Sequence, residues 1–187
     1  MGCTTQTGMG AVLDVAHADP ADSIAITGLG AVGMAAALTA DRICGATVVG
    51  VDISSQRRGL ASSLGLTVAD RVPAGVDTVI ECSGNPAALV DAVAATRTGG
   101  TIVVAGAPPF GTTVPLDSAE LVNRSLRIVG TVEGGSNLER LTRYLDLARE
   151  YDILPRNVLA VRPFTDVVRL GEPDTCVGVA KLVLTMS

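Results

Sequence analysis

The chain has 187 residues, of which 48% are hydrophobic and only 2% aromatic, so its core must be built mainly from Ala, Val, Leu and Ile. A formal net charge of −5 without a cluster of Lys or Arg argues against a phosphate-backbone partner, and we expect no nucleic acid to bind. No apolar run is long enough to span a bilayer and the N-terminus does not resemble a signal peptide, which favours a cytoplasmic protein without membrane association.

The length suits one domain, which we expect to cover residues 1–187 as a helical lead-in over 1–20 and a core over 21–187. The four cysteines are widely separated, and none has the spacing of a structural zinc site or a redox pair. His17 is the only histidine, so a site that needs a histidine ligand and a histidine base cannot form from this chain alone.

Helix-like and strand-like patterns alternate along the chain. Helices are predicted, in chain order, at residues 8–17, 31–41, 55–64, 86–96, 118–123 and 137–151. Strands are predicted at residues 23–27, 47–51, 67–70, 77–82, 101–105, 126–130 and 181–185. This alternation predicts an α/β fold, a doubly wound parallel sheet with helices on both faces in three layers (αβα), with the strand order 3-2-1-4-5-6.

The connection between the third and fourth predicted strands is unusually short. Parallel crossovers usually contain a dozen or more residues, whereas this chain offers only residues 71–76. The shortened third-to-fourth strand crossover therefore has no room for a helix, and we expect the third strand to be short, displaced or poorly ordered. The sheet face that this leaves uncovered is expected to expose apolar surface.

A glycine-rich turn follows the first predicted strand and opens the next helix. In Gly28-Leu29-Gly30-Ala31-Val32-Gly33, the first glycine makes the turn, the second admits a pyrophosphate and the third allows close helix packing. Asp52 ends the second strand about 20 residues later, where a carboxylate accepts ribose hydroxyls and repels a 2′-phosphate. The pattern predicts a Rossmann site for NAD(H) rather than NADP(H), although the nearby Arg57 leaves NADP open. The alternative for Asp52 is a turn or helix-capping residue.

Further segments add to the glycine turn. They are Gly2-Cys3-Thr4-Thr5-Gln6-Thr7-Gly8, Val51-Asp52, Glu81-Cys82-Ser83-Gly84-Asn85-Pro86 and Gly106-Ala107-Pro108-Pro109-Phe110-Gly111. With these motifs, nearly the whole chain resembles the coenzyme domain of the zinc-dependent medium-chain alcohol dehydrogenases, and most of all their aryl (benzyl) alcohol branch. The resemblance implies an oxidoreductase with NAD(H) as its cofactor.

The resemblance also implies which residues contact the cofactor. It places the pyrophosphate at the glycine turn, the adenosine ribose at Asp52 and the adenine beside Ile53 and Arg57. The nicotinamide ring would meet Thr7, its carboxamide would meet backbone groups near Thr131, and a cation near the pyrophosphate would come from the C-terminal segment. The full expected set is Thr7, Gly28, Leu29, Gly30, Ala31, Val32, Gly33, Asp52, Ile53, Arg57, Ser83, Ala105, Gly106, Ala107, Thr131, Glu133 and Lys181.

The catalytic residues are less well represented. Cys3 matches a position that supplies a zinc ligand in the family, whereas the other ligands lie in a preceding domain that this sequence lacks. We therefore expect no metal site and regard Cys3 as a relic of the ligand position. Glu133 is a speculative general base, with a solvated loop carboxylate as its alternative, and Cys82 is expected to fill the core. No catalytic residue is assigned, and the question of enzyme activity stays open.

Three hypotheses for function follow. The first is an NAD(H)-binding domain of an alcohol dehydrogenase-like oxidoreductase that cannot carry out zinc-dependent hydride transfer alone. The second is a subunit completed by a separate catalytic domain to oxidise an aryl or other primary alcohol. The third is a fold reused for non-redox chemistry on a small molecule. Separately, a homodimer is expected, formed through an exposed strand within residues 123–135.

Overall fold

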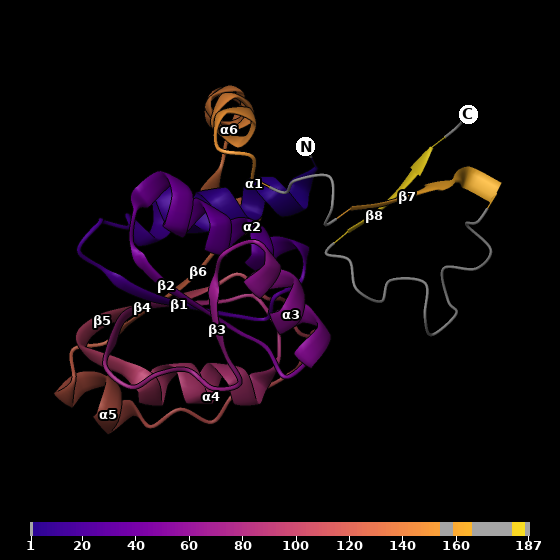
Figure 1. Ribbon diagram of the computed structural model, residues 1–187. Helices are drawn as coiled ribbons and strands as arrows, with labels where there is room; N and C mark the ends of the chain where they lie inside the picture. Colours follow the sequence, from indigo (N-terminus) through magenta and orange to yellow (C-terminus); the bar gives the residue numbers. More distant parts are fainter. Residues whose placement is uncertain (1, 154–158, 166–180, 186–187) are drawn as a thin grey trace.

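The computed structural model describes residues 2–153, 159–165 and 181–185. At its centre is a six-stranded sheet, in which all neighbouring strands are parallel and follow the order β3-β2-β1-β4-β5-β6 (Figure 1). The strands are β1 (Ser23–Thr27), β2 (Thr47–Val51), β3 (Thr67–Ala69), β4 (Val76–Glu81), β5 (Thr96–Val104) and β6 (Arg127–Gly130). The predicted strand order and parallel arrangement are confirmed.

Helices lie on both faces of this sheet, which confirms the three predicted layers (Figure 1). The helices on one face are α1 (Cys3–Gly10), η1 (Ala11–Ala16), α2 (Ala31–Thr39), η2 (Ala40–Cys44), α3 (Ser55–Ser63) and α6 (Leu138–Glu150). The helices on the other face are α4 (Pro86–Ala95) and α5 (Ser118–Asn123). Each group of helices encloses its own apolar cluster against the sheet.

Strand β1 shows how the side chains divide between the two clusters. Ile24 and Ile26 join the cluster beneath α1 and α2, whereas Ala25 joins the cluster that contains α4. Successive strand residues point to opposite faces, and here both faces are buried. The strand is therefore a nearly continuous apolar run, the pattern from which it was predicted.

Side-chain caps determine where several helices begin. Asn85 accepts a hydrogen bond from the Ala87 amide at 2.9 Å, one residue before Pro86 starts α4. Ser54 caps α3 in the same way. Such caps satisfy amides that have no partner within the helix, and proline suits the first helical position because it lacks an amide proton.

The N-terminal helix is longer than predicted, since it begins at Cys3 rather than at residue 8 and continues as η1. Two glycines lie at close backbone contacts within it. A Cβ atom on Gly8 would lie 2.5 Å from the Val32 carbonyl oxygen in α2, and one on Gly10 would lie 2.3 Å from the Gly134 carbonyl oxygen in η3 (Glu133–Gly135). The missed residues 3–7 include three threonines, which have low helix propensity, so the sequence analysis did not assign them to the helix; contacts with α2 and η3 stabilise this first part instead.

The third strand is short, as predicted, but it is not displaced. β3 pairs with β2 from Thr67 opposite Val49 to Ala69 opposite Val51, at the edge of the sheet. Residues 70–75, which link β3 to β4, contain no helix. The expected apolar exposure is wrong for the described residues, because no large hydrophobic residue of β2 or β3 is exposed and Val72 of the link packs into the α4 cluster.

Two strands differ from the predictions. β5 begins at Thr96, directly after α4, because a register shift against β4 accommodates residues that the sequence analysis assigned to a helix end and a turn. β7 (Leu159–Pro163) was not predicted, and it pairs in parallel with β8 (Lys181–Thr185), whose bounds are as expected. Within the described ranges, no helix is both long and apolar enough to cross a membrane.

Candidate functional site

The glycine turn between β1 and α2 shows a separate steric requirement at each glycine. Gly28 has φ +84°, a conformation that side chains disfavour. A Cβ atom on Gly33 would lie 1.9 Å from the Gly28 carbonyl oxygen, so only glycine lets the helix approach the turn. Around Gly30, by contrast, a Cβ atom would meet no atom within 4 Å. The open space lies at the glycine where a pyrophosphate is expected to approach.

The same turn presents the N-terminus of α2. Gly30 is the residue that precedes the helix, and no side chain caps it. The first amides of a helix lack partners within it, and the helix dipole favours an anion there. This end of α2 therefore has the donors that a diphosphate needs.

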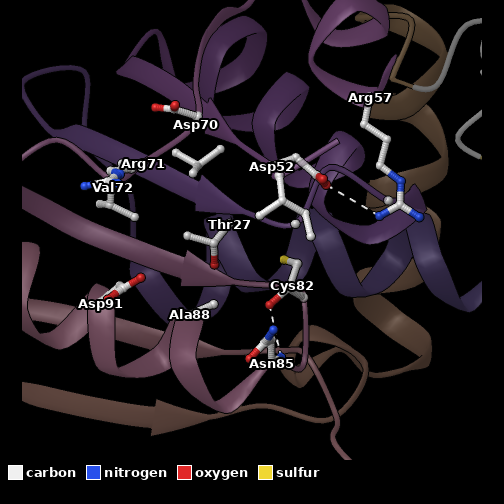
Figure 2. Close-up of a pocket in the computed structure, with 15 residues that line it drawn as sticks. Thr27, Asp52, Arg57, Asp70, Arg71, Val72, Cys82, Asn85, Ala88 and Asp91 are labelled. Atoms are coloured by element: carbon white, nitrogen blue, oxygen red, sulfur yellow. Dashed lines mark hydrogen bonds and ion pairs between the residues drawn. The ribbon is translucent and has the colours of Figure 1, made fainter. Parts of the chain in front are cut away.

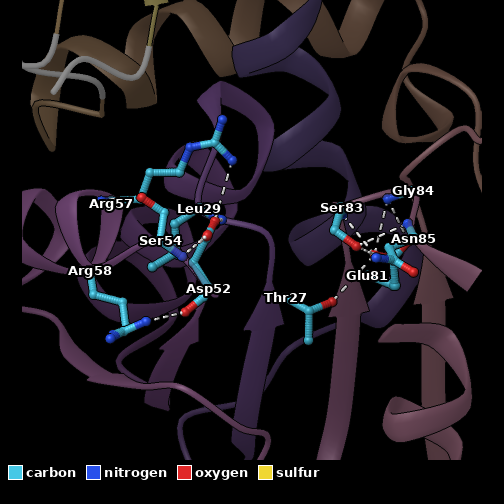
Figure 3. Close-up of polar contacts among 10 residues, drawn as sticks. All are labelled: Thr27, Leu29, Asp52, Ser54, Arg57, Arg58, Glu81, Ser83, Gly84 and Asn85. Carbon is cyan, nitrogen blue, oxygen red and sulfur yellow. Dashed lines mark hydrogen bonds and ion pairs between the residues drawn. The ribbon is translucent and has the colours of Figure 1, made fainter. Parts of the chain in front are cut away.

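Asp52 follows β2 and holds its carboxylate against the glycine turn (Figure 3). Its Oδ2 accepts a hydrogen bond from the Leu29 amide at 2.7 Å, and its Oδ1 accepts one from the Ser54 amide at 2.8 Å. The residue is only 6% exposed. The turn role left open by the sequence is thus present. Oδ1 keeps a lone pair, and Oδ2 shares its second lone pair only with Arg57 Nη1 at 3.5 Å, so the carboxylate can accept two ribose hydroxyls once Arg57 turns away.

Two arginines of α3 flank Asp52. Arg57 Nη1 lies 3.5 Å from Asp52 Oδ2 with 55% of its side chain exposed, while Arg58 Nη1 donates to the Asp52 carbonyl at 2.6 Å. An exposed ion pair of this kind contributes about 1 kcal/mol or less, so a ligand can displace Arg57 at little cost. Beside them Ile53 is 93% exposed and offers apolar surface to a flat ring.

A cavity of about 480 Å³ opens at this edge of the sheet (Figure 2). Its volume lies within the usual range for small-molecule sites. The cavity is bounded by the glycine turn, the ends of β2 and β4, the β3–β4 link and α4. The predicted cofactor residues that line it are Gly28, Gly30, Asp52, Ile53, Arg57 and Ser83.

Glu81 belongs to a motif that the sequence analysis quoted, but its structural role was not predicted. It ends β4, is almost fully buried, and its Oε1 accepts hydrogen bonds from the Ser83 amide at 2.7 Å, the Gly84 amide at 3.1 Å and the Ser83 hydroxyl (Figure 3). The carboxylate thereby shapes the loop that forms one wall of the cavity. The available signal was a strand-ending acid two residues before Ser83-Gly84, a sequence that supplies nearby amide donors.

Cys82 lines the cavity as well, beside Glu81. Desolvation, followed by the charge of Glu81, raises the pKa of the Cys82 thiol far above its usual range. A thiol in this environment stays protonated and is a poor nucleophile. The side chain therefore serves as packing against the cavity rather than as a reactive group.

The residues expected around the nicotinamide lie outside this cavity, just after β5 and β6 and within α1. The Ala105 and Gly106 amides both donate to the Glu81 carbonyl at 2.8 Å, and the Thr131 amide donates to the Val104 carbonyl at 3.0 Å. Because these amides are occupied, the carbonyl groups of the same residues are more available to a ligand than the amides are. Within the described part of the chain, the buried Thr131 hydroxyl has no hydrogen-bond partner.

Thr7 and Glu133 belong to two elements that pack together, α1 and η3. The Thr7 carbonyl oxygen would lie 2.6 Å from a Cβ atom on Gly134, and Gln6 donates to the Glu133 carboxylate at 3.4 Å. Glu133 is exposed, which fits the solvated alternative better than a general base. Ala107 is exposed in the loop that follows β5. Lys181, the predicted cation, is the first residue of β8.

A zinc site does not fit the donors that the structure describes. Cys3 is exposed at the first position of α1, and no group of three His, Cys, Asp or Glu residues in the described ranges is arranged to hold a metal. A catalytic zinc needs three protein ligands and an open position. We derive no chemistry through zinc for this chain.

Comparisons with known proteins agree with the resemblance found in the sequence. The family model described as zinc-binding dehydrogenase matches residues 31–150. Geraniol dehydrogenase of Castellaniella defragrans is 32% identical over 164 residues, which cover 80% of this chain and 44% of that protein. The crystal structure of benzyl alcohol dehydrogenase from Acinetobacter calcoaceticus has a TM-score of 0.85 and 30% identity, covering 100% of this chain and 55% of that one.

A zinc-binding dehydrogenase of Sinorhizobium meliloti 1021, solved bound to NADP, has a TM-score of 0.77 and 26% identity and covers 89% of this chain and 54% of that one. The chain thus spans about half the length of these structures. The matched residues begin at Ala31, inside the glycine turn, and include Asp52 and the loop that follows Glu81. With this fold, this site and this family match together, the chain belongs to the zinc-binding dehydrogenase family.

Proposed function

We propose that this chain binds a nicotinamide adenine dinucleotide at the carboxyl edge of its sheet, and that it prefers NAD(H) to NADP(H). The observation that carries the proposal is the Asp52 carboxylate. It is buried at the wall of the cavity and oriented by two backbone amides, and it has acceptor capacity on both oxygens when the exposed Arg57 turns away from Oδ2. A carboxylate in this position accepts the adenosine ribose hydroxyls and repels a 2′-phosphate.

The remainder of the site supports the same ligand. The open space at Gly30 and the uncapped start of α2 suit a pyrophosphate, and exposed Ile53 suits one face of a purine. Arg57 weakens the discrimination, because an exposed guanidinium can turn to a 2′-phosphate. We therefore propose a preference for NAD(H) and not exclusion of NADP(H), a view consistent with a family member solved with NADP.

The chain's own part in a redox reaction is to hold and orient the cofactor. Bound nicotinamide would supply a hydride acceptor or donor. The Ala105 carbonyl and the groups around Thr131 and Thr7 would orient the ring, while Glu81 keeps the neighbouring loops in register. Because the described donors do not form a metal site, we propose that the chain does not oxidise alcohols by itself.

The direct test is a fluorescence titration of the purified chain with NADH and NADPH. We expect saturable NADH binding in the micromolar to submillimolar range and NADPH binding at least about tenfold weaker, equivalent to 1.4 kcal/mol. Absence of NADH binding at millimolar concentration would overturn the proposal. Robust benzyl alcohol oxidation by the chain alone with added zinc would overturn the second part.

A second candidate function is a dehydrogenase subunit completed by a separate polypeptide. β7 and β8 form a two-stranded parallel sheet, and in the described part of the chain neither strand pairs with a third. Two-stranded sheets have marginal stability, and their open edges accept further strands. Co-purification with a partner that confers zinc-dependent alcohol oxidation supports this candidate, whereas a lone chain that stays inactive with every co-expressed family member contradicts it.

We also propose a homodimer through β6. This strand lies at the edge of the sheet and pairs only with β5 in the residues that the structure describes. An edge strand with unpaired amides can continue the sheet into a second copy. Light scattering after size exclusion should show a dimer, and an Ile128→Pro substitution, which removes an edge amide, should give a monomer; a wild-type monomer contradicts the proposal.

A further inference from the structure

The turn η3, which lies between β6 and α6, has an unusual backbone. Glu133, Gly134 and Gly135 have φ angles of +51°, +69° and +64°, so three successive residues lie in the left-handed region. A residue with a side chain, such as Glu133, adopts this region only at a cost in energy. Just after β6, the buried hydroxyl of Thr131 also has no hydrogen-bond partner among the described residues. Both features raise the energy of the observed conformation.

Side chains from α1 and α6 hold the turn in this conformation. Gln6 of α1 donates through Nε2 to the hydroxyl of Ser136, directly after the turn, and to the Glu133 carboxylate at 3.4 Å. Arg140 of α6 donates to the Gly135 carbonyl at 3.0 Å. The bond from Gln6 to Ser136 is half-buried, whereas the bond to Glu133 is exposed, so the first is the stronger restraint. The side chain of Gln6 thus joins both ends of the turn to α1.

The backbones of α1 and η3 are also in direct contact. A Cβ atom on Gly134 would lie 2.6 Å from the Thr7 carbonyl oxygen, and one on Gly10 would lie 2.3 Å from the Gly134 carbonyl oxygen. The turn therefore cannot change shape without also moving against the helix that carries Thr7. A costly backbone conformation persists only where its surroundings impose it, and such places are concentrated at sites that clamp a ligand.

The neighbours of the turn indicate which part of a ligand it would clamp. This step rests on the proposed function, in which the chain binds a nicotinamide adenine dinucleotide. The Thr131 amide donates to the Val104 carbonyl, so the start of the turn lies beside Ala105, and Thr7 lies on its α1 side. Ala105, Thr131 and Thr7 are the residues at which the nicotinamide is expected. The turn thus belongs to the nicotinamide end of the site, outside the cavity that Asp52 lines.

We propose that Gln6 is a positioning residue for the nicotinamide half of the cofactor. It acts through the turn: by joining Ser136 and Glu133 to α1, it keeps η3 in the left-handed conformation that sets the direction of the Thr131 carbonyl and the Glu133 amide. Without this restraint, the turn relaxes toward ordinary backbone angles. The nicotinamide then loses its hydrogen-bonding partners, while the adenosine half keeps Asp52.

The test compares NADH with ADP-ribose, which has the same diphosphate and both riboses but no nicotinamide. NADH is titrated by fluorescence, and ADP-ribose is measured by competition with it. In wild type we expect NADH to bind at least fivefold more tightly than ADP-ribose. Gln6→Leu should weaken NADH at least fivefold and ADP-ribose less than twofold. Enclosure shifts the emission of reduced nicotinamide to shorter wavelength, so the emission of bound NADH should return toward that of free NADH in the variant.

Three further variants separate positioning from general stability. Ser136→Ala removes the same half-buried hydrogen bond from the other side and should reproduce the selective loss of NADH binding. Glu133→Gly, combined with Gln6→Leu, should recover at least half of the lost affinity on a logarithmic scale, because glycine adopts the left-handed region without strain. Gln56→Leu is the matched control and should leave the ratio of the two affinities unchanged, since Gln56 is exposed on α3 and does not line the cavity.

The outcomes distinguish this inference from the proposed function. Equal weakening of NADH and ADP-ribose by Gln6→Leu would show a general structural role, and equal affinity of wild type for the two ligands would show that the nicotinamide is not held. Absence of recovery in the double variant would show that the strained turn is not the cause of the loss. Each of these results overturns the inference. Wild type that binds neither ligand refutes the proposed function, whereas wild type that binds both, with Gln6→Leu unchanged, refutes this inference alone.

Discussion

The substitution Asp52→Asn tests the central residue of the site. The wild-type carboxylate accepts the Leu29 amide on one oxygen and the Ser54 amide on the other, at 2.7 and 2.8 Å. An asparagine has one carbonyl oxygen and one NH₂ group, so one of these amides must face another donor. The same change removes an acceptor for one ribose hydroxyl and removes the charge that repels a 2′-phosphate.

The expected sizes follow from these contacts. One buried amide without its partner costs about 1–3 kcal/mol, which for a chain of this length lowers Tm by about 2–10 °C. Loss of one hydrogen bond to a charged group costs about 1.5–3 kcal/mol, so NADH should bind about 10- to 100-fold more weakly. NADPH loses less, because the repulsion also disappears, and the preference for NADH should narrow or reverse.

The assay is NADH and NADPH fluorescence titration below the Tm of the variant, with calorimetry to measure the Tm. Asp117→Asn is the matched control, because Asp117 also accepts a backbone amide, that of Ala119 at 2.8 Å, but caps α5 outside the cavity. Asparagine caps helices as well as aspartate does, so this control should change little. A folded Asp52→Asn variant that keeps both affinities within twofold would refute the ribose assignment.

Three further predictions concern the turn and two charged residues. A Cβ atom on Gly33 would lie 1.9 Å from a carbonyl oxygen, so Gly33→Ala should lower Tm by about 5 °C, whereas Gly30→Ala should keep Tm and weaken NADH binding. Hydrogen bonds from Ser23 hold the pKa of Asp77 well below its usual range, so the stability that they provide is present above about pH 4 and is lost as pH falls further. Glu133 has φ +51°, and Glu133→Gly should raise Tm by about 1–3 °C.

Each of these predictions has an outcome that contradicts it. Equal melting temperatures for Gly33→Ala and Gly30→Ala would show that the turn can relax around a methyl group. For Asp77, urea unfolding at pH 3 to 6 should show a steeper loss of stability in wild type than in Asp77→Asn, and parallel curves count against the argument. A lower Tm for Glu133→Gly would mean that its contact with Gln6 outweighs the backbone strain.

The sequence predicted most of the fold because the relevant signals are local. An apolar run, a turn and a capped helix each leave a pattern within a few residues, as Asn85 before Pro86 shows. Predictions failed where tertiary contact outweighed local preference. The helix α1 begins at Cys3 although residues 3–7 include three threonines, because its contacts with α2 and η3 stabilise it.

Some residues of the candidate site could likewise be predicted from local sequence, and others could not. The glycine turn and Asp52 could be identified from the sequence, because their spacing along the chain is fixed by one strand, one helix and the next strand. The role of Glu81 could not be identified from the sequence, since the amides that donate to its carboxylate reach it only when the loop folds back over it. The expected exposed apolar face was wrong for a similar reason, because the position of Val72 depends on the path of a link without regular structure.

The sequence by itself determined the alternation of strands and helices, the glycine turn that suits a diphosphate, and the acidic residue, Asp52, that follows the second strand. These features depend on the order of residues and on the periods of helix and strand. Only the tertiary structure decided how the short link crosses the sheet, and therefore that the cavity extends from Asp52 to Asp91. A cavity is the space left between segments far apart in the chain, so no single segment encodes it.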